Sequence, residues 1–128
     1  MYELSVEDEF SAAHRLRNYE GNCERLHGHN WRVCVTVQSN ELDDRGLVVD
    51  FKQLKAMLRR VLDGLEHQYL NELPPFDAIN PTCEHLASFI FKSVNQQILS
   101  DQVRIKSVRI WESAKSSCTY RGETHDNG

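Results

Sequence analysis

The sequence lacks several features that would mark other classes of protein. It has no apolar run close to the roughly 20 residues that span a bilayer, and no signal-peptide pattern follows Met1. Its four cysteines include no Cys-x-x-Cys pair, so we expect free thiols in a reducing cytosol. The formal net charge is −4, which argues against general nucleic-acid binding because that needs a basic surface. We therefore expect a cytoplasmic protein with neither a membrane nor a nucleic acid as its partner.

The chain is expected to form one domain. No internal repeat, low-complexity segment or linker interrupts its 128 residues, which are enough to bury a core. Hydrophobic residues make up 40% and charged residues 27%, as is usual for globular proteins. The predicted domain covers residues 1–122, and residues 123–128 form a polar tail.

Hydrophobic periodicity predicts four strands and two helices. Apolar and polar residues alternate over residues 2–14 and 31–38, as in half-buried strands. Asp50 can cap one helix and Thr82 or Asn80 a second, each followed by apolar residues at the i, i+3, i+4, i+7 spacing. Residues 103–112 alternate with a phase slip near Ser107 that suggests a bulge, and residues 117–122 form a short partner strand. The predicted fold is α+β, in the order strand-strand-helix-helix-strand-strand. An antiparallel four-stranded sheet would carry both helices on one face.

Three histidines have the parity of a metal site. His27 and His29 are two residues apart, so an extended chain presents them on one face, roughly 7 Å apart at Cα. His14 lies on the apolar parity of the first strand, near its end. If the two strands form a hairpin, the three imidazoles converge and suit zinc with one open coordination position, as in catalytic sites. The alternative is that His-Gly-His merely opens a strand and His14 is a core histidine.

The role of Cys23 is open on the sequence alone. A Cys-x3-His-x-His set could close a zinc tetrahedron. Equally, Cys23 precedes the strand in a loop and could be a reactive thiol, whose pKa Arg25 would help to lower.

Four further residues are candidates for acid–base or binding roles. Glu66 and His67 follow the first helix, where a carboxylate could orient an imidazole for proton transfer, or both could simply be a solvated helix end. Glu112 falls on the apolar parity of its strand, and a buried carboxylate needs a partner such as an arginine or a ligand with paired NH groups. Thr82 is explained by helix capping, with a ligand role as the lesser alternative.

The motifs together resemble a known family. FSAAH, CERLHGH, GLVVDF, LEHQYLN, NPTCEHLA and IWES…CTYRG occur in this order over nearly the whole chain. This series resembles the 6-pyruvoyl-tetrahydropterin synthase superfamily, and most of all its bacterial branch, the 6-carboxy-5,6,7,8-tetrahydropterin synthases of queuosine biosynthesis. The resemblance implies the tunnelling fold, in which subunits join edge to edge into a barrel. It also implies a homohexamer of two trimers with active sites at the subunit interfaces.

The resemblance also implies a chemistry and a role for each candidate. The chain would be a zinc-dependent carbon–carbon lyase that converts 7,8-dihydroneopterin triphosphate to 6-carboxy-5,6,7,8-tetrahydropterin, acetaldehyde and triphosphate. Zinc would be bound by His14, His27 and His29, while Cys23 would be the catalytic thiol. His67 with Glu66 would be the second acid–base group, although the family usually has Asp before this histidine. Glu112 would anchor the pterin ring, with Thr82 close by. The candidates for binding the triphosphate are Arg15, Arg17, Lys115 and Arg121.

Two alternatives to this lyase remain at this point. One lies within the family, a 6-pyruvoyl-tetrahydropterin synthase or a related pterin aldolase. The other is a non-catalytic binding domain stabilised by zinc, with Cys23 as the fourth ligand. That second alternative would leave Glu112 on the apolar face without a reason.

Overall fold

The computed structural model describes residues 1–19 and 25–123. Its elements follow the predicted order: the strands β1 (Tyr2–His14) and β2 (His27–Ser39), the helices α1 (Phe51–Asp63) and α2 (Cys83–Asn95), and the strands β3 (Arg104–Ser113) and β4 (Ser116–Tyr120). A short 3-10 helix, η1 (Leu70–Glu72), lies between the two α-helices. The predicted polar tail falls almost wholly outside the described residues. Within those residues, no helix is long and apolar enough to cross a bilayer.

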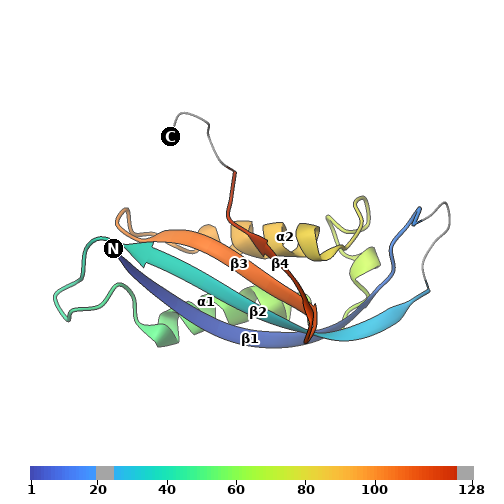
Figure 1. The fold of residues 1–128 in the computed structure, drawn as a ribbon, viewed down its shortest axis with the longest axis horizontal. Helices are drawn as coiled ribbons and strands as arrows, with labels where there is room; N and C mark the ends of the chain where they lie inside the picture. The colour runs from blue at the N-terminus through green and yellow to red at the C-terminus, as the bar shows by residue number, and fades with distance from the viewer. Residues whose placement is uncertain (20–24, 124–128) are drawn as a thin grey trace.

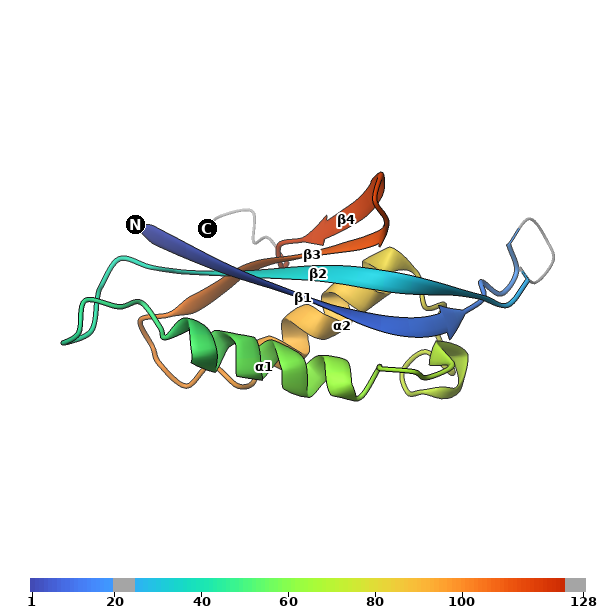
Figure 2. The same ribbon diagram turned by 90° about the horizontal axis from the view of Figure 1, so that it is seen from below.

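The four strands form one antiparallel sheet in the order β1-β2-β3-β4 (Figure 1). Seen along the sheet, both helices lie on the same side of it, so the molecule has two layers (Figure 2). The predicted bulge is present, because Thr36 pairs with Ser107 whereas Val37 pairs with Ile105, which leaves Lys106 as the extra residue. The predicted fold class is confirmed.

The helices begin where the sequence places their caps. The Asp50 side chain accepts a hydrogen bond from the Lys52 backbone N–H at 2.8 Å, and the Thr82 hydroxyl accepts one from the His85 N–H at 3.1 Å. Phe51, the first apolar residue after the Asp50 cap, is 53% exposed. The buried residues of α1 are Leu54, Leu58 and Leu62, at the predicted helical spacing.

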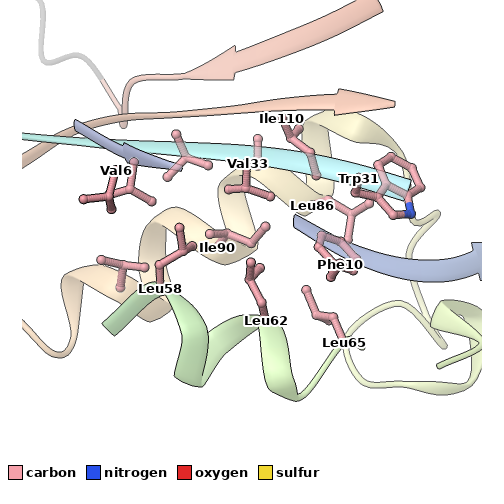
Figure 3. Close-up of a cluster of buried hydrophobic side chains, with 14 of the residues drawn as sticks. Val6, Phe10, Trp31, Val33, Leu58, Leu62, Leu65, Leu86, Ile90 and Ile110 are labelled. Atoms are coloured by element: carbon pink, nitrogen blue, oxygen red, sulfur yellow. The ribbon is translucent and has the colours of Figure 1, made fainter. Parts of the chain in front are cut away.

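The core lies between the sheet and the helices (Figure 3). The alternating inward residues of β1 and β2 meet the apolar stripes of both helices, as binary patterning requires. The largest fully buried side chain is Trp31, at the end of the core nearest the first residues of β2. The labelled core residues in Figure 3 are Val6, Phe10, Trp31, Val33, Leu58, Leu62, Leu65, Leu86, Ile90 and Ile110.

Candidate functional site

The β1–β2 hairpin brings the three histidines together. His14 pairs with His27 and Ala12 with His29 in the register of the two strands. The His14 Nε2 atom lies 3.0 Å from His27 Nε2. The ring centroid of His29 lies 5.2 Å from that of His14 and 4.7 Å from that of His27. Because the three imidazoles come from adjacent ends of two paired strands, the sheet itself positions them.

Backbone carbonyls orient two of these rings. His14 Nδ1 donates to the Pro81 carbonyl at 2.8 Å, and His27 Nδ1 donates to the Arg25 carbonyl at 2.8 Å. A carbonyl oxygen can only accept, so in each neutral ring the hydrogen is on Nδ1 and Nε2 carries a lone pair. The two lone pairs therefore face each other, an arrangement that a cation between them would stabilise. Imidazole nitrogens at 2.0–2.1 Å around a tetrahedral zinc ion are roughly 3.3 Å apart, so the donor set fits this metal.

Glu112 completes the cluster from β3. Its candidate ligand atom and those of His14, His27 and His29 all lie within 4.8 Å of one another. Glu112 Oε1 is 3.2 Å from His29 Nε2, and Oε2 accepts from the Cys83 thiol at 3.7 Å. The carboxylate thus has partners, as its parity required, but they are a histidine and a thiol rather than an arginine. Its side chain is also 37% exposed, so the group is less buried than the strand pattern suggested.

Burial sets the protonation of two groups in this region. His14 is 2% exposed, and its pKa is lowered from the usual value because burial disfavours the charged ring. The pKa of the Cys83 thiol is raised to about 12, first by burial and then by the negative charge of Glu112. His14 is therefore a neutral potential ligand near neutral pH, and Cys83 is a protonated hydrogen-bond donor.

Trp31 forms the boundary between the histidines and the core. Its side chain is completely buried, and its indole N–H donates to the Ala12 carbonyl at 3.3 Å. Its ring packs edge-on against His14 and His29, with centroids 4.9 and 5.1 Å away. The rings of His14 and His29 therefore pack against a buried aromatic side chain, which excludes water on the side that faces the core.

His67 lines a hollow beside the histidine cluster. This hollow has a volume of about 510 Å³, and His29 lines it together with His67 and the neighbouring segments of β1 and β2. His67 has a φ of 58°, in the left-handed region that non-glycine residues seldom adopt. One carboxylate oxygen of Glu66 accepts a hydrogen bond from the Ser11 backbone N–H at 2.6 Å. The other oxygen forms an ion pair with the Arg59 guanidinium at 3.5 Å.

Among the other predicted residues, Cys23 lies outside the described residues. Thr82 caps α2 directly after Pro81, which holds His14. The guanidinium of Arg17 donates to three backbone carbonyls of the loop after α1, so it already has a structural role. The exposed candidates for binding a triphosphate are Arg15, Lys115 and Arg121.

Sequence reasoning missed three residues that shape this region. Asn71 is 7% exposed and exchanges hydrogen bonds with the backbone N–H and carbonyl of Arg15, which ties η1 to the end of β1. The Cys83 thiol donates a hydrogen bond to Glu112, and Arg59 forms an ion pair with Glu66. None of the three had a local signal in the sequence, because each contact joins segments that are far apart along the chain.

Comparisons with known proteins agree on one family. A sequence model described as 6-pyruvoyl tetrahydropterin synthase matches residues 3–123. A 6-carboxy-5,6,7,8-tetrahydropterin synthase from Synechocystis is 35% identical, with 94% of this chain and 93% of the relative covered. A protein of the same name from Haemophilus influenzae is 31% identical, with 94% and 99% covered. The solved structure of Caenorhabditis elegans 6-pyruvoyl tetrahydropterin synthase superposes with a TM-score of 0.79 at 27% identity, over 95% of this chain and 96% of that one.

Proposed function

The chain belongs to the 6-pyruvoyl tetrahydropterin synthase family, and we propose that within it the protein is a pterin lyase of the 6-carboxy-5,6,7,8-tetrahydropterin synthase type. It would convert 7,8-dihydroneopterin triphosphate to the carboxylated tetrahydropterin, acetaldehyde and triphosphate, in queuosine biosynthesis. The names of the relatives from Synechocystis and Haemophilus influenzae support this reaction. The observation that carries it is the group of His14, His27, His29 and Glu112, with all four candidate ligand atoms within 4.8 Å of one another.

Each candidate residue has a role in this proposal. His14, His27 and His29 would hold zinc, which when bound supplies a Lewis acid able to polarise the oxygens of the substrate side chain. Glu112 would accept hydrogen bonds from the amino and ring NH groups of the pterin. Cys23 and His67 would move protons on opposite sides of the carbon skeleton. The hollow shared by His67 and His29 supports this arrangement, because it gives one substrate access to both.

The proposed assembly is a homohexamer built from two trimers. The outer strands of the sheet are β1 and β4, and exposed strand edges are usually covered by pairing or by other segments. Residues 67–69 cover the end of β1 near the histidines, through the Ser11 carbonyl and the Ala13 N–H. The earlier part of β1 and the outer edge of β4 could pair between subunits, which would place active sites at the interfaces.

Product analysis tests the proposed reaction. Purified, zinc-loaded protein would be incubated with 7,8-dihydroneopterin triphosphate, and the products analysed for acetaldehyde and a carboxylated tetrahydropterin. We expect both in equal amounts. Since the Caenorhabditis elegans neighbour is named for a pyruvoyl product, that product without acetaldehyde would identify the other branch of the family.

A Cys23→Ala variant separates an enzyme from a structural zinc domain. The proposal expects this variant to keep its zinc and its stability while losing turnover. Loss of zinc and of stability would instead identify Cys23 as the fourth ligand of a structural site. Zinc content is measured by metal analysis, so this readout does not depend on knowing the substrate.

A further inference from the structure

A second hollow lies at the end of the molecule away from the histidines. It has a volume of about 590 Å³ and lies between α1, the loop that joins β2 to α1 and the segment that joins α2 to β3. In Figures 1 and 2 both connections lie at the opposite end of the sheet from the ends of β1 and β2 that carry the histidines. Val37 in the lining is eight residues from His29 along β2, which is roughly 26 Å of strand. None of the described residues that line this hollow belongs to the histidine cluster.

The floor of the hollow is aliphatic. Val37 of β2, Val48 of the β2–α1 loop and Leu54 of α1 line it, and each of these side chains is at most 8% exposed. The partly buried side chains of Met57 and Ile98 extend the apolar surface. A mainly apolar lining and a volume of roughly 300–1,000 Å³ are typical of sites for small ligands. The hollow therefore has the size and the surface to bury the apolar part of a small molecule.

The β2–α1 loop, which forms one wall, is held in place by its own hydrogen bonds. The Asp43 carboxylate accepts from the backbone N–H of Arg45 at 2.8 Å and from that of Leu47 at 3.0 Å, and the Asp43 N–H donates to the Leu47 carbonyl at 2.8 Å. Gly46 closes this turn with a φ of 80°, which glycine adopts without strain. The Arg45 guanidinium contacts the other Asp43 oxygen at 3.2 Å, so these two charges of the lining offset each other. The wall is consequently formed before any ligand binds.

Arg60 supplies a cation on the side of the hollow nearest α2. Its Nη1 atom donates to the Gln97 side-chain oxygen at 3.0 Å, and the Gln97 amide nitrogen donates to the Met57 carbonyl at 2.9 Å. A neutral amide thus orients the guanidinium, and among the residues that the structure describes Arg60 forms no ion pair. Because a guanidinium has five N–H donors, those that Gln97 leaves can bind a carboxylate through two parallel hydrogen bonds.

The distribution of charge around the hollow favours an anion at Arg60. Lys52 lies eight residues earlier on α1, roughly 12 Å along the helix axis, directly after the loop whose Glu41 and Asp43 also line the hollow. The loop side therefore carries charges of both signs. On the opposite side, the lining residues of segment 97–103 are all uncharged, so the positive charge of Arg60 has no acidic neighbour in that segment of the lining.

We propose that this hollow is a second binding site, for a small anionic amphiphile that consists of a carboxylate on an aliphatic chain of medium length. Arg60 binds the carboxylate, and the floor formed by Val37 and Leu54 receives the chain. Leu99, which also lines the hollow, is 91% exposed, so a bound aliphatic chain that contacts it removes apolar surface from water. The site is separate from the histidine cluster and does not depend on the proposed reaction.

Isothermal titration calorimetry with octanoate tests the site, and 1-octanol is the uncharged ligand of the same chain length. We expect one saturable site per chain, with a dissociation constant of about 0.1 mM for octanoate, as is usual for so small a ligand. Binding of 1-octanol should be at least about tenfold weaker, because it lacks the charge that Arg60 binds. Equal affinity for the two ligands would refute the role of the carboxylate, and absence of saturable octanoate binding up to about 5 mM would refute the site.

Three single substitutions on one face of α1 separate the anchor from the floor. Arg60→Gln should weaken octanoate binding by about tenfold and change 1-octanol binding by less than about threefold. Lys52→Gln is the matched control, because it removes one positive charge from the lining of the same hollow, and octanoate binding should stay within about threefold of wild type. Ala56 lies between these two residues and also lines the hollow. Ala56→Trp should weaken binding of both ligands by at least about tenfold, because the indole occupies the space of the chain.

Thermal unfolding of each variant is measured first. Lys52 and Arg60 are exposed, so their glutamine variants should fold normally and test the anchor even if Ala56→Trp is unstable. Equal losses of octanoate affinity in Lys52→Gln and Arg60→Gln would show that only net charge counts and would overturn the assignment to Arg60. Wild-type affinity in a folded Ala56→Trp variant would place the ligand elsewhere. Sedimentation velocity tests the other occupant, a second copy of the chain. A change of oligomeric state on adding octanoate, or in Ala56→Trp, would make the hollow a contact between copies and the proposal wrong.

Discussion

Trp31 joins the hydrophobic core to the histidine cluster, and replacing it with phenylalanine should weaken both. The indole ring packs against Phe10 on one side, with centroids 6.0 Å apart, and edge-on against His14 and His29 on the other. A phenyl ring fills less of this space and has no N–H for the Ala12 carbonyl. The variant therefore tests whether the core positions the histidines.

The size of the effect follows from three contributions. A lost volume of roughly 40 Å³, at about 24 cal/mol per Å³ of cavity, costs about 1 kcal/mol. The lost hydrogen bond, whose acceptor is buried, costs about 1 kcal/mol. The smaller apolar surface that is buried adds a few tenths to about 1 kcal/mol. We expect Trp31→Phe to lower the free energy of unfolding by about 2–3 kcal/mol, and the zinc affinity by about tenfold because the rings lose their support.

Urea unfolding and zinc titration measure the two effects, with Trp111→Phe as the matched control. Trp111 lies on the face of the sheet away from the helices, between the guanidinium groups of Arg32 and Arg109 at 4.2 and 4.5 Å. Its replacement should cost about 1 kcal/mol or less and leave zinc affinity unchanged. Equal losses of stability in the two variants, or wild-type zinc affinity in Trp31→Phe, would refute the reasoning.

Three further predictions concern protonation and capping. Burial lowers the pKa of His14 in the folded protein. In the unfolded chain this histidine has an ordinary pKa of about 6.5, so as the pH falls the unfolded chain is protonated at a higher pH than the folded protein. The metal-free protein should be fully stable above that pH and lose stability as the pH falls below it, which urea unfolding at pH 7.5 and 5.5 would reveal. Because the pKa of Cys83 is raised to about 12, iodoacetamide at pH 8 should alkylate this thiol about a thousandfold more slowly than an unperturbed one; peptide mass spectrometry showing the rate of the unfolded chain would contradict this. Thr82→Ala removes the cap of α2 and should cost about 1 kcal/mol in thermal unfolding, whereas Thr82→Ser should be nearly neutral.

The elements and the convergence of the histidines could be predicted from local patterns. The alternation of β1 and β2 sets which side chains share a face, and a hairpin of two such strands must place His14 near His27 and His29. The capping residues Asp50 and Thr82 likewise predict where the two helices begin. These predictions succeeded because periodicity and capping depend only on near neighbours in the chain.

The surroundings of each candidate side chain needed the tertiary structure. For Glu112 the sequence suggested an arginine or a ligand as partner; the protein groups that the structure places against it are His29 and Cys83, the latter 29 residues away, and no arginine among the described residues. It left open an acid–base dyad or a solvated helix end for Glu66, and the structure shows that the carboxylate accepts a hydrogen bond from the Ser11 N–H, 55 residues away. Arg17 was a candidate for binding the triphosphate, but its guanidinium donates hydrogen bonds to backbone carbonyls that lie more than 50 residues further along the chain.

The sequence by itself determined the strands, the helices, the faces on which the histidines lie and, through its motifs, the resemblance to the family. Only the tertiary structure decided which groups the charged and polar side chains contact. Hydrophobic periodicity determines a buried face because every second or every third to fourth residue repeats the same requirement. A carboxylate or guanidinium has no such repeat. It turns to whichever donors or acceptors folding brings within reach, and those come from distant segments.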